Sequence, residues 1–354
     1  TPSAGCLNVG DEILLINLQG SQITNANTGN YEFLKIASVS GTTVTFTTSK
    51  LKWYGDAAYS DTNIGTGSGQ QRVMLMRVPN YNNVTVNGTL TGNGWDGLKY
   101  GVLAYRVAGT LSGSGTIHMD AKGYLGGAGG YYVEGSGGNL AGYQGESYGG
   151  PGSSNTGSSN LGGGGAGYTP RANGGGAGYR SIGTTSSDSG GGLGGSVYGE
   201  PTLLKLLPGS GGGGGEGWAN NLIDQSAGSG GNGGGAVLII ANQISFTGVL
   251  SSNGGGGGNS FPASWEMYGG SGSGGAIRIE GKYISLNTIS VAGGTAYASG
   301  GQGRIAVYYE SSENVSLNYP SAYVALLNQQ ATPTPVPTSI VLATPNPYGT
   351  GADG

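Results

Sequence analysis

The sequence predicts an all-β protein with a β-helix-like or stacked-sheet core from which glycine-rich segments extend. Three observations support this class. Blocks rich in β-branched and aromatic residues alternate apolar and polar side chains with a period of two. Glycine accounts for 80 of the 354 residues and occurs in long runs. A strand-like unit recurs with an offset of 40 residues. The alternative is a jelly roll or β-sandwich with glycine-rich insertions.

Residues 1–122 form a predicted N-terminal β region. Its strand-like blocks are bounded by turn residues, and none of them sustains the 3.6-residue apolar period of a helix. Within NVTVNGTL, the pair Asn87-Gly88 is a strong signal for a tight hairpin. The predicted strands are EILLINL (12–18), YEFLKIASV (31–39), TTVTFTTS (42–49), RVMLMRV (72–78), NVTVNGTL (83–90) and GVLAYRV (101–107).

Residues 123–235 form a glycine- and tyrosine-rich region. GGGGAGY (162–168) recurs as GGGAGY (174–179). Glycine loses more backbone entropy on ordering than any other residue, so such runs fold where side chains would not fit. A flexible linker of this kind would carry serine rather than regularly placed tyrosines. We therefore expect close-packed extended chains resembling polyglycine II, with tyrosines covering them.

Residues 236–325 form a repeat region that we expect to pack with the N-terminal part. GGAVLIIANQISFTGVLSSNGG (234–255) aligns with GGAIRIEGKYISLNTISVAGG (274–294), and a third copy begins at GQGRIAVYY (301–309). YGVLAYRV (100–107) resembles the same unit upstream. Repeats that bury one face against the next copy predict a stacked β architecture. The alternating apolar positions are Val237 and Ile239, Ile277 and Ile279, and Ile305 and Val307.

Residues 326–354 form a predicted extended tail. Its Thr-Pro alternation is typical of an extended spacer. The β-prone run SIVLA (339–343) follows, and Pro345 closes it. We expect this run to add as a strand to an open sheet edge of a neighbouring copy. The assembly residues are Ser339, Ile340, Val341, Leu342 and Ala343, and the candidate O-glycosylation sites beside prolines are Thr332, Thr334 and Thr338.

Composition excludes several classes of function. Charged residues make up 9% of the chain, against about a quarter in typical proteins, which favours a subunit of an assembly. A net charge of −4 without a Lys/Arg cluster argues against nucleic acid. No run of 18 apolar residues predicts a transmembrane helix. The single Cys6 allows no disulfide within the chain. A start at Thr-Pro-Ser is typical of a processed product, so we expect an extracellular protein.

The residues that carry catalysis elsewhere are sparse in this sequence. His118 is the single histidine, and Asp120 follows it on the same strand face, but no nucleophile accompanies the pair. Arg278, Glu280 and Lys282 alternate in sign, which is typical of a solvated strand face. The sequence therefore predicts no catalytic residue and no enzyme. A β-helix enzyme that degrades polysaccharides is the weaker alternative, because two acids can meet from distant strands.

No motif indicates a cofactor. GGQGRIAVY (300–308) resembles a calcium-binding nonapeptide in its glycines, but Ile305 stands where the liganding Asp is required. Calcium is therefore left open without an indicated site. Aromatic residues beside polar ones could stack on sugar rings, but covering the glycine chains is the favoured interpretation. The residues concerned are Tyr168, Tyr179, Trp95 and Trp218.

The order of several motifs resembles that of secreted, glycine-rich bacterial surface proteins described as adhesin-like. The motifs are VGDEILLINLQG (9–20), GNYEFLKIASVSG (29–41), RVPNYNNVTV (77–86), NGWDG (93–97), GGSGSGGAIRIEG (269–281) and GGQGRIAVYYE (300–310). The resemblance covers about residues 5–310 and implies a structural or adhesive role at the cell surface. By composition, the glycine region also resembles polyglycine-II sandwiches of some phage tail-tip adhesins.

We therefore predict a structural subunit of an extracellular bacterial filament or surface layer. Its partners would be copies of itself, because a head-to-tail contact that does not close propagates as a polymer. A surface adhesin or carbohydrate-binding module, with surface glycans as partners, is the alternative.

Overall fold

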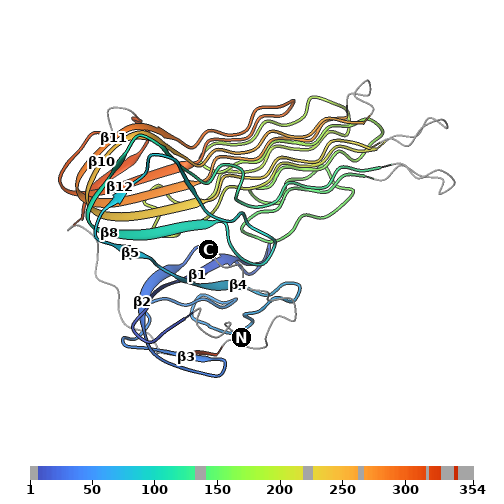
Figure 1. The fold of residues 1–354 in the computed structure, drawn as a ribbon. Helices are drawn as coiled ribbons and strands as arrows, with labels where there is room; N and C mark the ends of the chain where they lie inside the picture. The colour runs from blue at the N-terminus through green and yellow to red at the C-terminus, as the bar shows by residue number, and fades with distance from the viewer. Residues whose placement is uncertain are drawn as a thin grey trace.

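The structure, a computed structural model, describes residues 7–131, 141–217, 226–261, 267–315, 319–327 and 339–341. Regular structure in this part of the chain consists of strands in two sheets (Figure 1), which confirms the predicted all-β class. The strands are β1 (Glu12–Gln19), β2 (Tyr31–Ser40), β3 (Thr43–Phe46), β4 (Arg72–Arg77), β5 (Asn80–Tyr81), β6 (Val84–Thr85), β7 (Thr89–Thr91), β8 (Val102–Gly113), β9 (Thr116–His118), β10 (Ala236–Ser251), β11 (Ala276–Ser290), β12 (Arg304–Glu313), β13 (Tyr323–Leu326) and β14 (Ser339–Val341).

The larger sheet is a parallel stack of the sequence repeats. Its strands follow the order β13-β12-β11-β10-β8-β5, and β6, β7 and β9 extend it. Ala236 pairs with Ala276 and Ile240 with Glu280, which is the 40-residue offset of the repeat. Ala276 then pairs with Arg304 of the third copy, and the upstream unit pairs with β10 in the same way. Parallel pairing of successive copies is the pattern of stacked repeats, whereas sandwiches are built from antiparallel pairs.

Strands β10 and β11 bend where their alternation changes phase. In β10, Val237 and Ile239 point into the core before the bend, and Ile244 and Phe246 do so after it. Asn242 and its neighbour at the bend are exposed, so the inward positions change from odd to even numbers there. Both halves of the strand consequently bury side chains in one core. This core includes the apolar pairs predicted from β10, β11 and β12.

The predicted hairpin at Asn87-Gly88 is wrong. β6 and β7, on either side of it, pair in parallel with β8 and β9. A type I′ turn needs positive φ at both central residues, and neither Asn87 nor Gly88 adopts it. The segment instead turns a corner beside Gly113, where the Val86 amide donates to the Ser112 carbonyl at 2.9 Å. Stacking on the next rung therefore overrides the local turn signal.

The smaller sheet has the order β14-β3-β2-β1-β4 and is antiparallel. β1 is buried on both faces because the sheet lies between two cores. Leu14 and Ile16 pack with Leu238 of β10, on the outer side of the stack. Ile13 and Leu15 lie in a separate cluster on the other face. The predicted division into residues 1–122, 123–235, 236–325 and 326–354 stays a prediction. β8, from the first of these regions, lies in the same sheet as β10 to β12 of the third.

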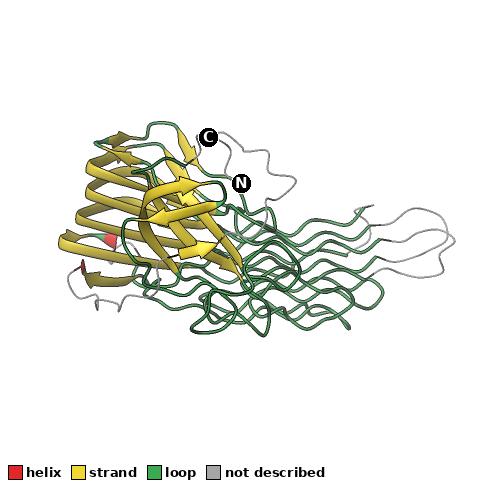
Figure 2. Ribbon diagram, turned by 90° about the horizontal axis from the view of Figure 1, so that it is seen from below, coloured by secondary structure: helices red, strands yellow, loops and turns green. Residues whose placement is uncertain are grey.

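Glycine-rich segments extend from the strand ends and run side by side away from the two sheets (Figure 2). After β10 ends, residues 252–261 run outward, and residues 267–275 return to begin β11. The Gly272 amide donates to the Gly255 carbonyl at 2.9 Å, so outward and returning segments are bonded to each other. We call these segments the glycine block. It consists of residues 123–131, 141–217, 226–235, 252–261, 267–275 and 291–303.

Backbone hydrogen bonds hold the glycine block together in several directions. The amides of residues 211, 212 and 213 donate to backbone carbonyls of three different segments. The amides of residues 214, 215 and 216 donate to the same three segments in the same order, and all six N–O distances are 2.8 to 3.0 Å. The carbonyls of residues 210–215 accept from three further segments. This three-residue period is that of extended threefold helices such as polyproline II. The six surrounding segments are 143–146, 172–175, 228–231, 127–130, 164–167 and 270–273.

Candidate functional site

The best candidate for a functional site is the outer edge of the smaller sheet, at β3. Val44 and Phe46 anchor β3 in the core at 3% and 5% exposure. Thr43 and Thr45 alternate with them and are exposed. The strand pairs on one side with β2, where Val39 faces Val44. Its other side is where a further strand can add.

β14 occupies this outer edge. It runs antiparallel to β3, with Ser339 opposite Thr45, Ile340 opposite Val44 and Val341 opposite Thr43. The strand lies far from β3 in sequence, and in space it completes the five-stranded sheet. The main-chain ladder of such a pair provides affinity with little demand on side-chain identity.

The sequence of β3 explains why this edge needs a partner strand. Exposed edges are normally protected by charged residues, prolines or bulges that prevent pairing with other chains. The run TTVTFTTS (42–49) contains no charged residue and no proline, and its polar residues are threonines and one serine. β3 is therefore a regular, uncharged edge that accepts a strand readily.

The assembly residues predicted from the sequence are placed in part. Ser339 to Val341 form the expected strand, and in this single chain they pair with the chain's own β3. Pairing with a neighbouring copy stays a prediction. Leu342, Ala343 and the threonines Thr332, Thr334 and Thr338 lie outside the described residues. The sequence had not identified β3 as the acceptor. Its lack of charge is the signal that could have done so.

Two of the candidate aromatic residues pack inside the molecule. Tyr179 is fully buried, stacks on Tyr198 at 4.3 Å between ring centroids and donates to the Leu207 carbonyl at 3.0 Å. Burial raises the pKa of Tyr179 well above its usual value, so its phenol remains a donor. Trp95 is 3% exposed and donates to Glu146 Oε2 at 2.7 Å. Both residues belong to the apolar cluster in which β1 packs against β10.

The other two candidates differ. Tyr168 is 46% exposed and lies at the surface of the glycine block. Trp218 lies outside the described residues. Nearby, Glu216 is 5% exposed and its Oε2 has no hydrogen-bond partner. Burial raises the pKa of Glu216 to about 7, so this carboxyl is largely protonated in slightly acidic solution.

We expect Tyr179→Ala to reduce the free energy of unfolding by about 3–5 kcal/mol, the usual cost of deleting a buried aromatic ring. Tyr168→Ala should change it by less than about 1 kcal/mol, since nearly half of that side chain is already exposed. Denaturant unfolding of the two variants checks this difference. Equal effects would contradict the assignment of Tyr179 as a packing residue.

Of the two candidate acid–base residues, Asp120 makes hydrogen bonds to the neighbouring rung. His118 Nδ1 lies 3.8 Å from Asp120 Oδ2, but Asp120 also accepts from the Ser251 hydroxyl at 2.9 Å and the Asn253 amide at 2.6 Å. A carboxylate bonded in this way connects one rung to the next.

The interpretation of residues 278–282 as a solvated strand face is wrong at its first position. Arg278 is 2% exposed and its guanidinium lies over the Tyr308 ring, 4.1 Å from the centroid. It forms an ion pair with Glu280 at 2.6 Å and donates to the Leu203 carbonyl at 3.2 Å. Arg278 is buried on the face of the sheet where Leu14 and Ile16 of β1 pack with Leu238, whereas Lys282 at the bend is exposed.

Within the described ranges, no three His, Cys, Asp or Glu side chains gather as a metal-ligand set. The same residues contain no helix of the length and apolar character needed to cross a membrane. Comparison of the chain with protein-family models, curated proteins and solved structures finds no match.

Proposed function

We propose that this protein is a structural subunit of an extracellular filament or surface layer, in which β14 of one copy pairs with β3 of the next. The observation that carries the proposal is the antiparallel pairing of Ser339–Val341 with β3. This pairing joins a strand at the end of a Thr-Pro spacer to an edge that lacks protective charges.

The same contacts can form within one chain or between two. When identical copies exchange β14, each β14 makes the same contacts with a neighbour's β3 that it makes with its own. A single chain with β14 on its own β3 therefore corresponds to the monomer from which such an exchanged assembly would form. Eleven residues lie between Leu327 and Ser339, and the twelve chain steps that join the two span at most about 43 Å when extended. A spacer of this reach lets β14 arrive at a neighbour's β3. If each copy gives its strand to one neighbour and receives a strand from another, the contact is head-to-tail and propagates.

The remainder of the chain is consistent with a structural role. A low content of charge leaves little repulsion between copies. The large backbone-bonded glycine block offers a rigid body rather than a mobile catalytic surface. Among the described acids that were candidates for catalysis, Asp120 bonds to Ser251 and Asn253 of the neighbouring rung, and Glu280 is paired with Arg278 of its own strand.

Cysteine pairs across β3 and β14 test the exchange directly. In a Cys6→Ser background, we expect Val44→Cys with Ile340→Cys to form disulfides between chains in assembled material. The Cα–Cα distance across an antiparallel pair alternates between hydrogen-bonded and non-hydrogen-bonded positions. Thr45→Cys with Ser339→Cys, one position along, therefore tests the other of the two distances. Non-reducing gels of oxidised assemblies should show a ladder of dimers, trimers and higher species.

A pair out of register, Thr45→Cys with Val341→Cys, is the matched control and should cross-link much less. If filaments form and all disulfides in them lie within single chains, the exchange of β14 is wrong. If the purified chain stays monomeric under all assembly conditions, the proposed function itself fails.

A further inference from the structure

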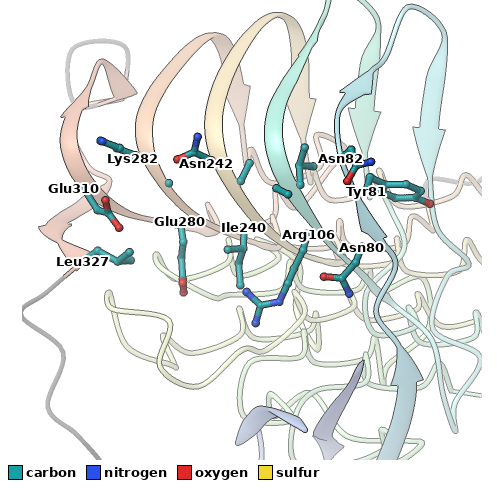
Figure 3. Close-up of a pocket in the computed structure, with 14 residues that line it drawn as sticks. Asn80, Tyr81, Asn82, Arg106, Ile240, Asn242, Glu280, Lys282, Glu310 and Leu327 are labelled. Carbon is teal, nitrogen blue, oxygen red and sulfur yellow. The ribbon is translucent and has the colours of Figure 1, made fainter. Parts of the chain in front are cut away.

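A groove of about 450 Å³ crosses the strands of the larger sheet at their bends (Figure 3). Its walls come from five successive strands, β5, β8, β10, β11 and β12. Ile240, half-buried, forms part of its floor together with Leu327. None of the lining residues belongs to β3 or β14, so this groove is separate from the assembly edge.

Polar side chains line the groove in a regular row. Asn242, Lys282 and Glu310 occupy the exposed bend position of three neighbouring strands, just after the pairs Ala241–Gly281 and Gly281–Tyr309. Adjacent strands lie about 4.8 Å apart, so one hydrogen-bonding group is presented at each such step. Figure 3 shows the side chains of Asn242, Lys282 and Glu310 in a row along the bends.

An aromatic ring lies at the opposite end of the groove. Tyr81 is 48% exposed and belongs to β5, the first strand of the series. Asn82 follows it and adds a further exposed amide. The groove thus has the Tyr81 side chain at one end and amide, ammonium and carboxylate groups along its length.

The charges of the groove largely cancel. Arg106 Nε lies 2.9 Å from Glu12 Oε2, and Glu280 is paired with Arg278. Lys282 and Glu310, on adjacent strands, have opposite signs. A polyanion such as nucleic acid or a phosphate polymer would meet no net positive field here. The complementary ligand is uncharged, linear and rich in hydroxyl groups.

We infer that this groove binds a neutral linear glycan, lying across the strands with one end stacked on Tyr81. The length of one sugar residue in such a chain is close to the strand spacing, so each sugar meets one rung of the row. A small number of convergent polar groups around an apolar floor is the usual composition of a ligand site. The bound polysaccharide would attach the protein to a cell wall or matrix.

Isothermal titration calorimetry with the full chain tests the site, with cellohexaose, maltohexaose and chitohexaose as neutral probes and polygalacturonate as the anionic one. We expect at least one neutral probe to bind. Tyr81→Ala and Asn242→Ala should each weaken that binding by about tenfold or more, in the range of residues that dominate an interface. All the substituted side chains are exposed, so the thermal midpoints should stay near that of the parent.

Matched controls separate the groove from general surface effects. Gln243→Ala removes an exposed amide adjacent to Asn242 that does not line the groove, and Tyr168→Ala removes a tyrosine of similar exposure on the glycine block. Both should retain the parent affinity. The inference is overturned if no neutral probe binds at millimolar concentration, if polygalacturonate alone binds, or if the controls weaken binding as much as the groove variants do.

Discussion

Gly213→Ala is expected to cause a large loss of stability, at least about 3 kcal/mol, which is the upper end of the usual range for overpacking. Gly213 lies inside the glycine block, with its amide bonded to Gly175 and its carbonyl to Gly270. A methyl group at this position would meet the carbonyl oxygen of Gly165 far inside van der Waals contact. The obstructing atoms belong to backbone, so no side chain can rotate away.

The effect should extend beyond the substituted residue. Moving the Gly165 segment away would break hydrogen bonds that the same segment makes with its other neighbours, because each segment is bonded on several sides. Thermal unfolding followed by circular dichroism provides the measurement. Hydrogen exchange should report faster exchange at the amides of the surrounding segments.

Gly88→Ala is the matched control. Nothing lies within 4 Å of the position that its methyl group would occupy, and its φ is not in the left-handed region. This substitution should be neutral or stabilise the protein by about 0.4–1 kcal/mol through the unfolded state. Equal unfolding midpoints for the two variants would contradict the close packing of the glycine block.

Removal of residues 331–354 is expected to abolish assembly while leaving a folded chain. The truncated protein retains every residue that the described part of the chain contributes to the three apolar cores. It loses β14, so the outer side of β3 has no partner strand. Size-exclusion chromatography and negative-stain electron microscopy would measure the loss of filaments.

A synthetic peptide spanning residues 331–354 makes this experiment sharper. It should bind the truncated chain by completing the β3 edge, and it should cap assemblies of the full-length chain. The same peptide with Ile340→Pro is the control, since proline disfavours a paired strand. Filaments formed by the truncated chain itself would show that β14 is not the connecting element.

The sequence predicted the parts of the fold that depend on local pattern or on repetition. The 40-residue offset between 234–255 and 274–294 determined the register of β10 and β11, because equivalent residues of stacked copies become neighbours. The hairpin prediction at Asn87-Gly88 failed because turn propensity is a local signal and the pairing there is not local. The exposure of Arg278 was misjudged for a related reason: the second sheet that buries it is distant in sequence.

Of the two strands of the candidate site, only the added strand β14 was predictable from the sequence. The strand at Ser339–Val341 follows from composition, since a β-prone run stands between proline-rich segments. Its acceptor depends on which strand is left at an edge, and strand order is a property of the whole sheet. The distinction between buried Tyr179 and exposed Tyr168 was equally out of reach, because the two occur in nearly identical motifs.

The three-residue period of the glycine block restricts how such a protein can change in length. Adding one residue to a segment would rotate every later amide toward the wrong neighbour, whereas adding three would restore the original directions. Outward and returning segments are bonded to each other, so both must grow together. In related chains, the length of the glycine block is therefore expected to differ by multiples of three residues, with the same change in an outward segment and in the returning segment bonded to it.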